Sequence, residues 1–126
     1  MRHRCGTFRG WRKTAARKTL TQVGKTEATL TVSHIPFEVS ISKCEEIAKA
    51  QIVGNHIGVL KILSPPDTRK VLGVHVIGEN AAEIVHIGQS VLTFGGTTDY
   101  FRDTVFNYPT FAEAYKVAGL DGLNKL

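Results

Sequence analysis

The sequence predicts an α+β fold, in which helices pack on one face of an antiparallel sheet. Strand-like segments come first along the chain and the strongest helical segments come last, an order typical of this class. Two apolar runs rich in β-branched residues are joined by only about five residues. Because a parallel crossover needs about a dozen residues or more, these two strands are expected to be antiparallel neighbours.

The composition indicates one folded domain. The chain has 126 residues, of which 42% are hydrophobic, enough for a core and too many for a disordered chain. No apolar run approaches the roughly 18 residues that span a bilayer, and the first residues do not form a secretory signal. Cys5 and Cys44 form neither a Cys-x-x-Cys pair nor a zinc ribbon. We therefore expect a cytoplasmic protein without a metal site.

Positive charge is concentrated in residues 1–19, which we expect to be a basic leader before a folded domain at 20–126. The leader holds seven of the 16 Lys and Arg residues and no acid, whereas the rest carries nine bases against eleven acids. Three interpretations stay open: a disordered extension left by truncation, an organelle-targeting peptide, or an arm for nucleic acid. Because the domain itself is mildly acidic, nucleic acid is not its expected partner.

The first elements follow from caps and alternation. A strand is expected to end near Gly24, and Thr26 is placed to cap a short helix that runs to about His34. Proline directly after Ile35 ends this helix. Residues 37–42 alternate apolar and polar side chains, which predicts a half-buried strand.

The middle of the chain contains an ambiguous stretch and a clear hairpin. Residues 43–49 fit either a helical turn or a loop, and residues 50–53 are predicted to be extended. The apolar runs at 57–63 and 71–77 predict the central hairpin. His75 alternates with the valines on either side, so we expect a packing role on the opposite face rather than a metal ligand.

Helical periodicity then predicts a long helix over 79–94, which ends at a pair of glycines. Glu83 and His86 have the spacing of a di-iron motif, but the chain contains no second copy, so we interpret them as part of a polar stripe. A short helix or turn is expected over 97–103, and a last helix over 110–118.

The segment Tyr108-Pro109-Thr110-Phe111-Ala112-Glu113 is the most informative motif. Thr110 and Glu113 have the spacing of a capping box, and Pro109 fixes the entrance to the helix. This structural role suffices by itself. A functional role requires Tyr108 at the surface, where its hydroxyl meets a partner or Glu113, although an ordinary phenol with a pKa near about 10 is a poor base at neutral pH.

The chain contains no Gly-x-Gly-x-x-Gly, Walker phosphate loop or Gly-x-Ser-x-Gly segment. The obvious classes of nucleotide-binding enzyme and hydrolase are therefore not expected for this chain alone.

Several segments, in order and over about residues 20–126, resemble the C-terminal dimerisation domain of the pyridine nucleotide-disulfide oxidoreductases. The segments are Gly24-Lys25-Thr26-Glu27, Gly58-Val59-Leu60-Lys61-Ile62, Val71-Leu72-Gly73-Val74-His75-Val76-Ile77-Gly78 and Ala82-Glu83-Ile84-Val85-His86. Within the family the resemblance is strongest to the transhydrogenases, on Ala48-Lys49-Ala50-Gln51-Ile52, Phe106-Asn107-Tyr108-Pro109-Thr110 and Asp121-Gly122-Leu123-Asn124.

The resemblance implies that the chain is one part of an FAD-dependent oxidoreductase that passes hydride between nicotinamides. The family's disulfide reductases carry a catalytic His-Pro-Thr-x-x-Glu motif, in which Tyr108 here takes the histidine's place and Glu113 matches the glutamate. Tyr108 and Pro109 are thereby implied to line the FAD pocket of a partner subunit, and the helix at 79–94 to form a homodimer interface.

The domains that bind FAD and NAD(P) in this family have no counterpart in the chain. We therefore expect no cofactor and no activity for the chain alone, and expect its partner to be a second copy or those missing domains. A gene fragment is the simplest explanation. The alternative is a stand-alone protein-interaction module that reuses the fold.

Overall fold

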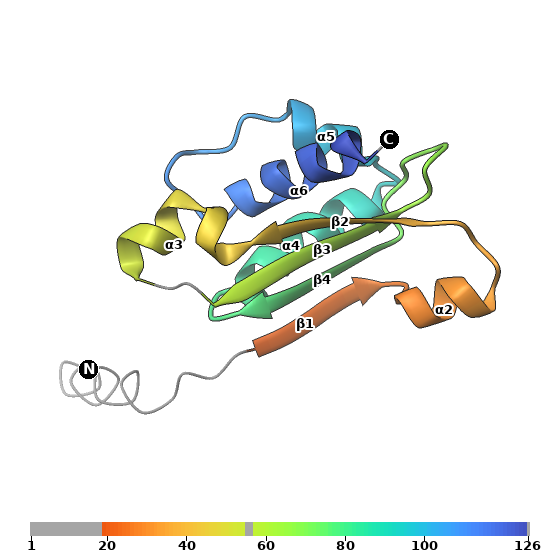
Figure 1. Cartoon of the computed structure of the whole chain (residues 1–126), viewed down its shortest axis with the longest axis horizontal. Helices are drawn as coiled ribbons and strands as arrows, with labels where there is room; N and C mark the ends of the chain where they lie inside the picture. The colour runs from red at the N-terminus through yellow and green to blue at the C-terminus, as the bar shows by residue number, and fades with distance from the viewer. Residues whose placement is uncertain (1–18, 55–56, 126) are drawn as a thin grey trace.

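The computed structural model describes residues 19–54 and 57–125, and in them a four-stranded antiparallel sheet lies against a layer of helices (Figure 1). The strands are β1 (Thr19–Gly24), β2 (Glu38–Lys43), β3 (Gly58–Ser64) and β4 (Gly73–Gly78), in the order β1-β4-β3-β2. The helices are α2 (Glu27–Val32), the 3₁₀ helix η1 (Cys44–Glu46), α3 (Ala48–Val53), α4 (Ala81–Thr93), α5 (Thr98–Asp103) and α6 (Glu113–Asn124). The predicted α+β class is confirmed.

The central hairpin is formed by β3 and β4 as predicted, with Leu60 opposite Val76 and Ile62 opposite Val74. These four side chains are buried on the face that the helices cover. His75 lies on the other face, where its Nε2 is 3.1 Å from the backbone oxygen of Lys25 and donates to it. The predicted placement of this histidine on the face opposite Val74 and Val76 is confirmed.

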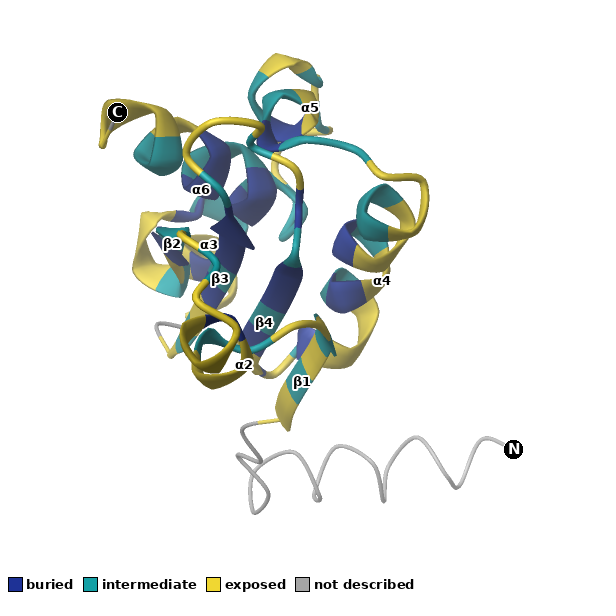
Figure 2. Ribbon diagram, turned by 90° about the vertical axis from the view of Figure 1, so that its right-hand side faces the viewer, coloured by how far each residue is buried: buried dark blue, intermediate teal, exposed yellow. Residues whose placement is uncertain are grey.

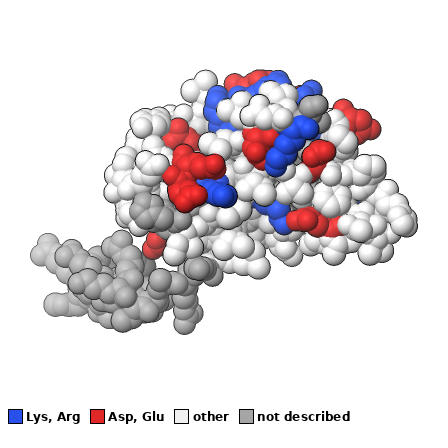
Figure 3. Space-filling view, in the orientation of Figure 1, with Lys and Arg blue, Asp and Glu red and all other residues white. Residues whose placement is uncertain are grey.

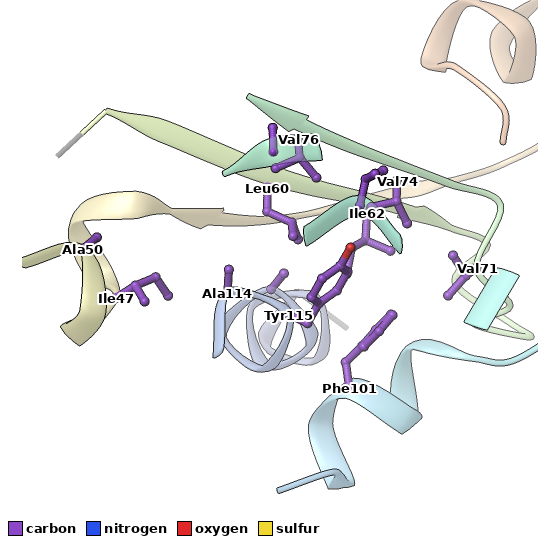
Figure 4. Close-up of a cluster of buried hydrophobic side chains, with 13 residues drawn as sticks. Ile47, Ala50, Leu60, Ile62, Val71, Val74, Val76, Phe101, Ala114 and Tyr115 are labelled. Carbon is purple, nitrogen blue, oxygen red and sulfur yellow. The ribbon is translucent and has the colours of Figure 1, made fainter. Parts of the chain in front are cut away.

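The main core lies between the sheet and the helices α4, α5 and α6 (Figure 4). Its largest members are the fully buried rings of Phe101 and Tyr115, which stack with their centroids 4.8 Å apart. Such a pair adds about 0.5–1.5 kcal/mol to the stabilisation that comes from burial alone. The two rings therefore fix α5 against α6.

Tyr115 also connects α6 to α4. Its hydroxyl accepts a hydrogen bond from the Gly88 backbone nitrogen (3.0 Å) and donates one to the Ile84 backbone oxygen (2.8 Å). Burial raises the pKa of Tyr115, so the hydroxyl keeps the proton that it donates. The phenol thus bonds to one backbone N–H and one backbone carbonyl that lie a single helical turn apart in α4.

Tyr115→Phe is expected to lower the free energy of unfolding by about 1–2 kcal/mol. The change removes both hydrogen bonds of the hydroxyl and leaves a small empty space in the core where the oxygen was. Urea unfolding followed by circular dichroism measures this loss. Tyr100→Phe, at a half-exposed ring on α5, serves as the control and should change the stability by less than about 0.5 kcal/mol. An equal effect of both variants contradicts the role assigned to Tyr115.

The outer edge of β2 is protected by side chains from the end of α6. The Asp121 carboxylate accepts a hydrogen bond from the Ile41 backbone nitrogen at 2.9 Å. Lys125 donates to the Val39 backbone oxygen at 2.8 Å and to Asp121 at 2.7 Å. This pair takes up a donor and an acceptor that an edge strand otherwise presents to other chains.

The stability of the domain is expected to fall at acid pH through Asp121. Partial burial by itself raises the pKa of this carboxyl, but the hydrogen bonds from Lys125 and Ile41 outweigh it and hold the pKa below its usual value. A depressed folded-state pKa gives stability that is complete above the unfolded pKa of about 3.9 and is lost as the pH falls through the folded-state pKa. Asp121→Asn should therefore flatten the dependence of the urea midpoint on pH between about pH 5 and pH 2. Glu45→Gln, at an exposed acid, should leave that slope unchanged.

Most of the predicted boundaries agree with the structure. Thr26 caps α2 through its Oγ1, which accepts from the Thr29 backbone nitrogen at 3.1 Å. The helical alternative for residues 43–49 is confirmed by η1, and the segment at 97–103 contains α5. Thr19, assigned above to the leader, is the first residue of β1, and the remainder of the leader lies outside the described residues.

One predicted element was wrong, and the bounds of another differ from the prediction. Residues 50–53 are helical in α3, not extended. The small or straight-chain residues Ala48, Lys49, Ala50 and Gln51 favour a helix, and Gly54 ends it in the left-handed region at φ 72°.

The last helix begins at Glu113 and continues to Asn124, well past the predicted end at residue 118. Glycine is tolerated inside it because α6 packs closely on β2. A Cβ atom at Gly122 would lie 2.1 Å from the Ser40 hydroxyl oxygen.

In the part of the chain that the structure describes, no helix is long and apolar enough to cross a bilayer.

Candidate functional site

The loop at 104–112, which joins α5 to α6, carries the motif that the sequence singled out. It runs along the outer side of the helical layer (Figure 1). Tyr108 is 75% exposed and Val105 is 89% exposed, and Pro109 after a cis peptide bond is exposed as well. Tyr108 and Pro109 therefore lie at the surface, the position that a functional role requires.

Glu113 lies at the start of α6 and bonds to the backbone rather than to Tyr108. Its Oε2 accepts from the Thr110 backbone nitrogen at 3.3 Å, which is the half of the predicted capping box that forms. The Thr110 hydroxyl instead donates to the Asn107 backbone oxygen at 2.6 Å. Among the described residues, the Tyr108 hydroxyl has no hydrogen-bond partner. The geometry is that of an exposed phenol on a loop anchored at its base by Glu113.

A second exposed apolar region lies where α4 ends and α5 begins. Phe94 is 90% exposed and Tyr100 is 49% exposed, and both line a hollow of about 500 Å³, measured with its solvent-open mouth. The sequence reasoning missed this pair because it counted only the apolar stripe of α4 that faces the core. The available signal was that Phe94 lies outside that stripe, directly before two glycines.

The outward side of α4 is polar in its first part. Buried residues of α4 face the sheet and exposed ones face away from it (Figure 2). Glu83 and His86 lie on the exposed side, where His86 Nδ1 is 2.9 Å from Gln89 Oε1. Within residues 19–54 and 57–125, no three His, Cys, Asp or Glu side chains gather in a group that could hold a metal ion.

Charged side chains on the described body are mixed in sign. Figure 3 shows acidic and basic groups next to one another on the face in view. Arg69 and Arg102 both pair with Asp99, at 3.0 and 3.2 Å, and Lys61 pairs with Glu27. Such pairing makes these basic groups less available to an anionic partner.

The family of this chain follows from its match to one known protein family. The dimerisation domain of the pyridine nucleotide-disulphide oxidoreductases matches residues 16–118. The chain belongs to this family. The resemblance found in the sequence is thereby confirmed.

Among known relatives, this dimerisation domain is similar to soluble pyridine nucleotide transhydrogenases. It is 52% identical to that of Photobacterium profundum over 110 residues, and 53% identical to that of Vibrio atlanticus over the same length. Each match covers 85% of this chain and 24% of the relative. The chain thus spans about a quarter of the length of the transhydrogenases it matches.

Solved structures agree on the fold of the dimerisation domain. The flavoprotein disulfide reductase RclA of Escherichia coli, solved as a Cu(II) complex, superposes with a TM-score of 0.75 at 25% identity over 80% of this chain and 23% of that one. LpdA of Mycobacterium tuberculosis gives 0.74 at 18% identity over 85% of this chain and 24% of that one. The predicted reductase dimerisation-domain fold is confirmed.

Proposed function

We propose that this domain pairs with a second copy of itself through the outward side of α4 and the loop at 104–112. The observation that carries the proposal is the exposure of large apolar side chains along this layer of helices. They are Phe94, Tyr100, Val105 and Tyr108. Burying a side chain of this size contributes about 1.5–3 kcal/mol, so a two-fold interface, which uses each residue twice, gains several such terms.

Polar residues of α4 are suited to the rim of the same interface. A stable interface buries about 1,200–2,000 Å² in total, more than four apolar side chains on each copy supply. Glu83 and His86 are exposed on the same helix and extend the surface. A polar rim of this kind gives register to a pair whose affinity comes from its apolar centre.

Size-exclusion chromatography with light scattering over a concentration series tests the pairing. We expect the mass to rise toward that of two chains as the concentration increases. A single-chain mass over the whole series would instead support the alternative, a stand-alone module with another partner. Whether the mass rises with concentration therefore separates the two functions.

We propose further that, joined to the FAD and NAD(P) domains of its family, the domain completes the flavin site of the partner subunit. Tyr108 and Pro109 offer one apolar wall on an exposed loop, which suits the edge of a flavin and does not form a nucleotide cradle by itself. When bound, the flavin supplies the hydride chemistry. Tyr108 excludes water and positions the ring, and Glu113 holds the loop in place through Thr110.

The test joins this chain to the FAD and NAD(P) domains of a transhydrogenase relative and measures hydride transfer between nicotinamides. Tyr108→Ala is expected to lower kcat about tenfold, whereas Tyr108→Phe should stay within about twofold, because the ring and not the hydroxyl is used. If Tyr108→Phe loses as much activity as Tyr108→Ala, the phenol acts as an acid or base and the positioning role is wrong. Tyr100→Ala is the control, because it weakens the pairing of the two copies without changing the wall formed by Tyr108 and Pro109, and its kcat shows how much of the loss comes from weaker pairing.

A further inference from the structure

A small hollow opens between η1, the ends of β3 and β4, and the start of α6. It measures about 300 Å³ with its solvent-open mouth, and about 30 Å³ of it is accessible to the centres of water molecules. Most of its lining is apolar and includes Ile47, Val76, Ile84 and Phe111. This hollow is separate from the exposed hollow at Phe94 and contains neither Tyr108 nor Pro109.

A buried hydroxyl without a partner lines this hollow. Ser42 is 1% exposed and lies opposite Leu60 in the β2–β3 pair, so its side chain shares the covered face of the sheet. In the described part of the chain, Ser42 Oγ has no hydrogen-bond partner. Because a buried polar group is normally satisfied, an orphan hydroxyl that lines an open hollow points to a ligand.

The lining carries no charged side chain. Cys44 lies beside Ser42 in the hollow, and burial raises the pKa of its thiol, so the sulfur is uncharged at neutral pH. An ion entering this space would lose its hydration without gaining a counter-charge. The hollow therefore selects a neutral ligand.

We propose that this hollow is a binding site for a small neutral molecule with one hydroxyl group on a short apolar body, of the class of a four-carbon alcohol. The ligand's hydroxyl exchanges a hydrogen bond with Ser42 Oγ, and its carbon chain lies against Ile84 and Phe111. A water molecule can make the same hydrogen bond but leaves the apolar lining wet. The alcohol satisfies the hydroxyl and covers the lining at once.

Titration of the ¹⁵N-labelled full chain with 1-butanol tests the site. The amide signals of Cys44, Gly58 and Ile84 are expected to shift along saturable curves that share one dissociation constant. Ser42→Ala should weaken this binding about three- to tenfold, the value of one neutral hydrogen bond. Ser40→Ala is the matched control, because Ser40 is equally buried on the same face of β2 but does not line this hollow, and it should leave the constant unchanged.

A second measurement on the unmodified chain keeps the proposal testable if Ser42→Ala does not fold. Iodoacetamide alkylates a thiolate by forming a sulfur–carbon bond as iodide leaves, and the thiol proton passes to the buffer. Saturating 1-butanol should slow this reaction at Cys44 at least threefold, with Cys5 as the internal reference in the mass spectrum. Three results would each overturn the proposal and leave only bound water in the hollow. They are amide shifts that rise linearly with the alcohol concentration, an affinity for the alcohol that is unchanged in Ser42→Ala, and an alkylation rate of Cys44 that the alcohol does not slow.

Discussion

Gly88→Leu is expected to lower the free energy of unfolding by about 3 kcal/mol, because α4 packs directly against both β4 and Tyr115 of α6 at this position. A Cβ atom there would lie 2.8 Å from the Tyr115 hydroxyl oxygen and 2.8 Å from a methyl carbon of Val74. Neither neighbour can move freely, since Val74 is fully buried in β4 and the Tyr115 hydroxyl is bonded to α4 itself. The helix must move away from the core to admit the new side chain.

Urea unfolding measures the loss at Gly88, and Ala82→Leu is the matched control. Ala82 lies on the exposed side of the same helix, so the same new side chain there should change the stability by less than about 0.5 kcal/mol. A loss at Gly88 no larger than at Ala82 contradicts the close approach of α4.

Phe94→Glu is expected to raise the dissociation constant of the paired domains by at least about 100-fold. At 90% exposure in the single chain, Phe94 contributes little to folding and much to any contact that buries it. The change removes about 1.5–3 kcal/mol of apolar burial from each copy and places one carboxylate of each copy in the proposed interface. Sedimentation equilibrium of the variant gives the constant directly.

The control for Phe94→Glu is Val32→Glu. Val32 is 79% exposed on α2, away from α4 and α5, so it offers the same type of change outside the proposed interface. Pairing should be unaffected by it. Equal weakening by both variants indicates a general effect of charge, and equal pairing in Phe94→Glu and the wild type excludes Phe94 from the interface.

Elements with a strong local pattern were predictable from the sequence, and elements with a weak pattern were not. The hairpin of β3 and β4 was predictable because the connection between its two apolar runs is too short for a parallel crossover. The core face of α4 was predictable from its helical period. In contrast, α3 is one short helix with exposed Ile52 and Val53, and such a short apolar run has no period that separates helix from strand.

The full length of α6 depended on a tertiary contact. Gly119 and Gly122 lower helix propensity, so the local pattern predicted an end near residue 118. Close packing on β2 and α5 overrides that preference. The contact with Ser40 links residues some 80 positions apart and leaves no mark on the local sequence.

The candidate site was predicted in part. The motif at Tyr108 and Glu113 was recognisable because Glu113 matches the glutamate of the family's motif and Tyr108 stands in place of its histidine. For the exposure of Phe94 the sequence offered one signal only, its place outside the apolar stripe of α4, and a residue at a helix end is also able to fold inward. The orphan hydroxyl of Ser42 could not be predicted, since alternation places it on the buried face without showing whether a partner meets it there.

Isotope-filtered NMR on a mixture of labelled and unlabelled chains detects only contacts between copies, so it is a direct test of pairing through α4 and the loop at 104–112. We expect intermolecular signals from Phe94, Tyr100 and Val105. Intermolecular signals confined to the open face of the sheet, at Leu20, Val59 and Ile77, would contradict the proposed interface.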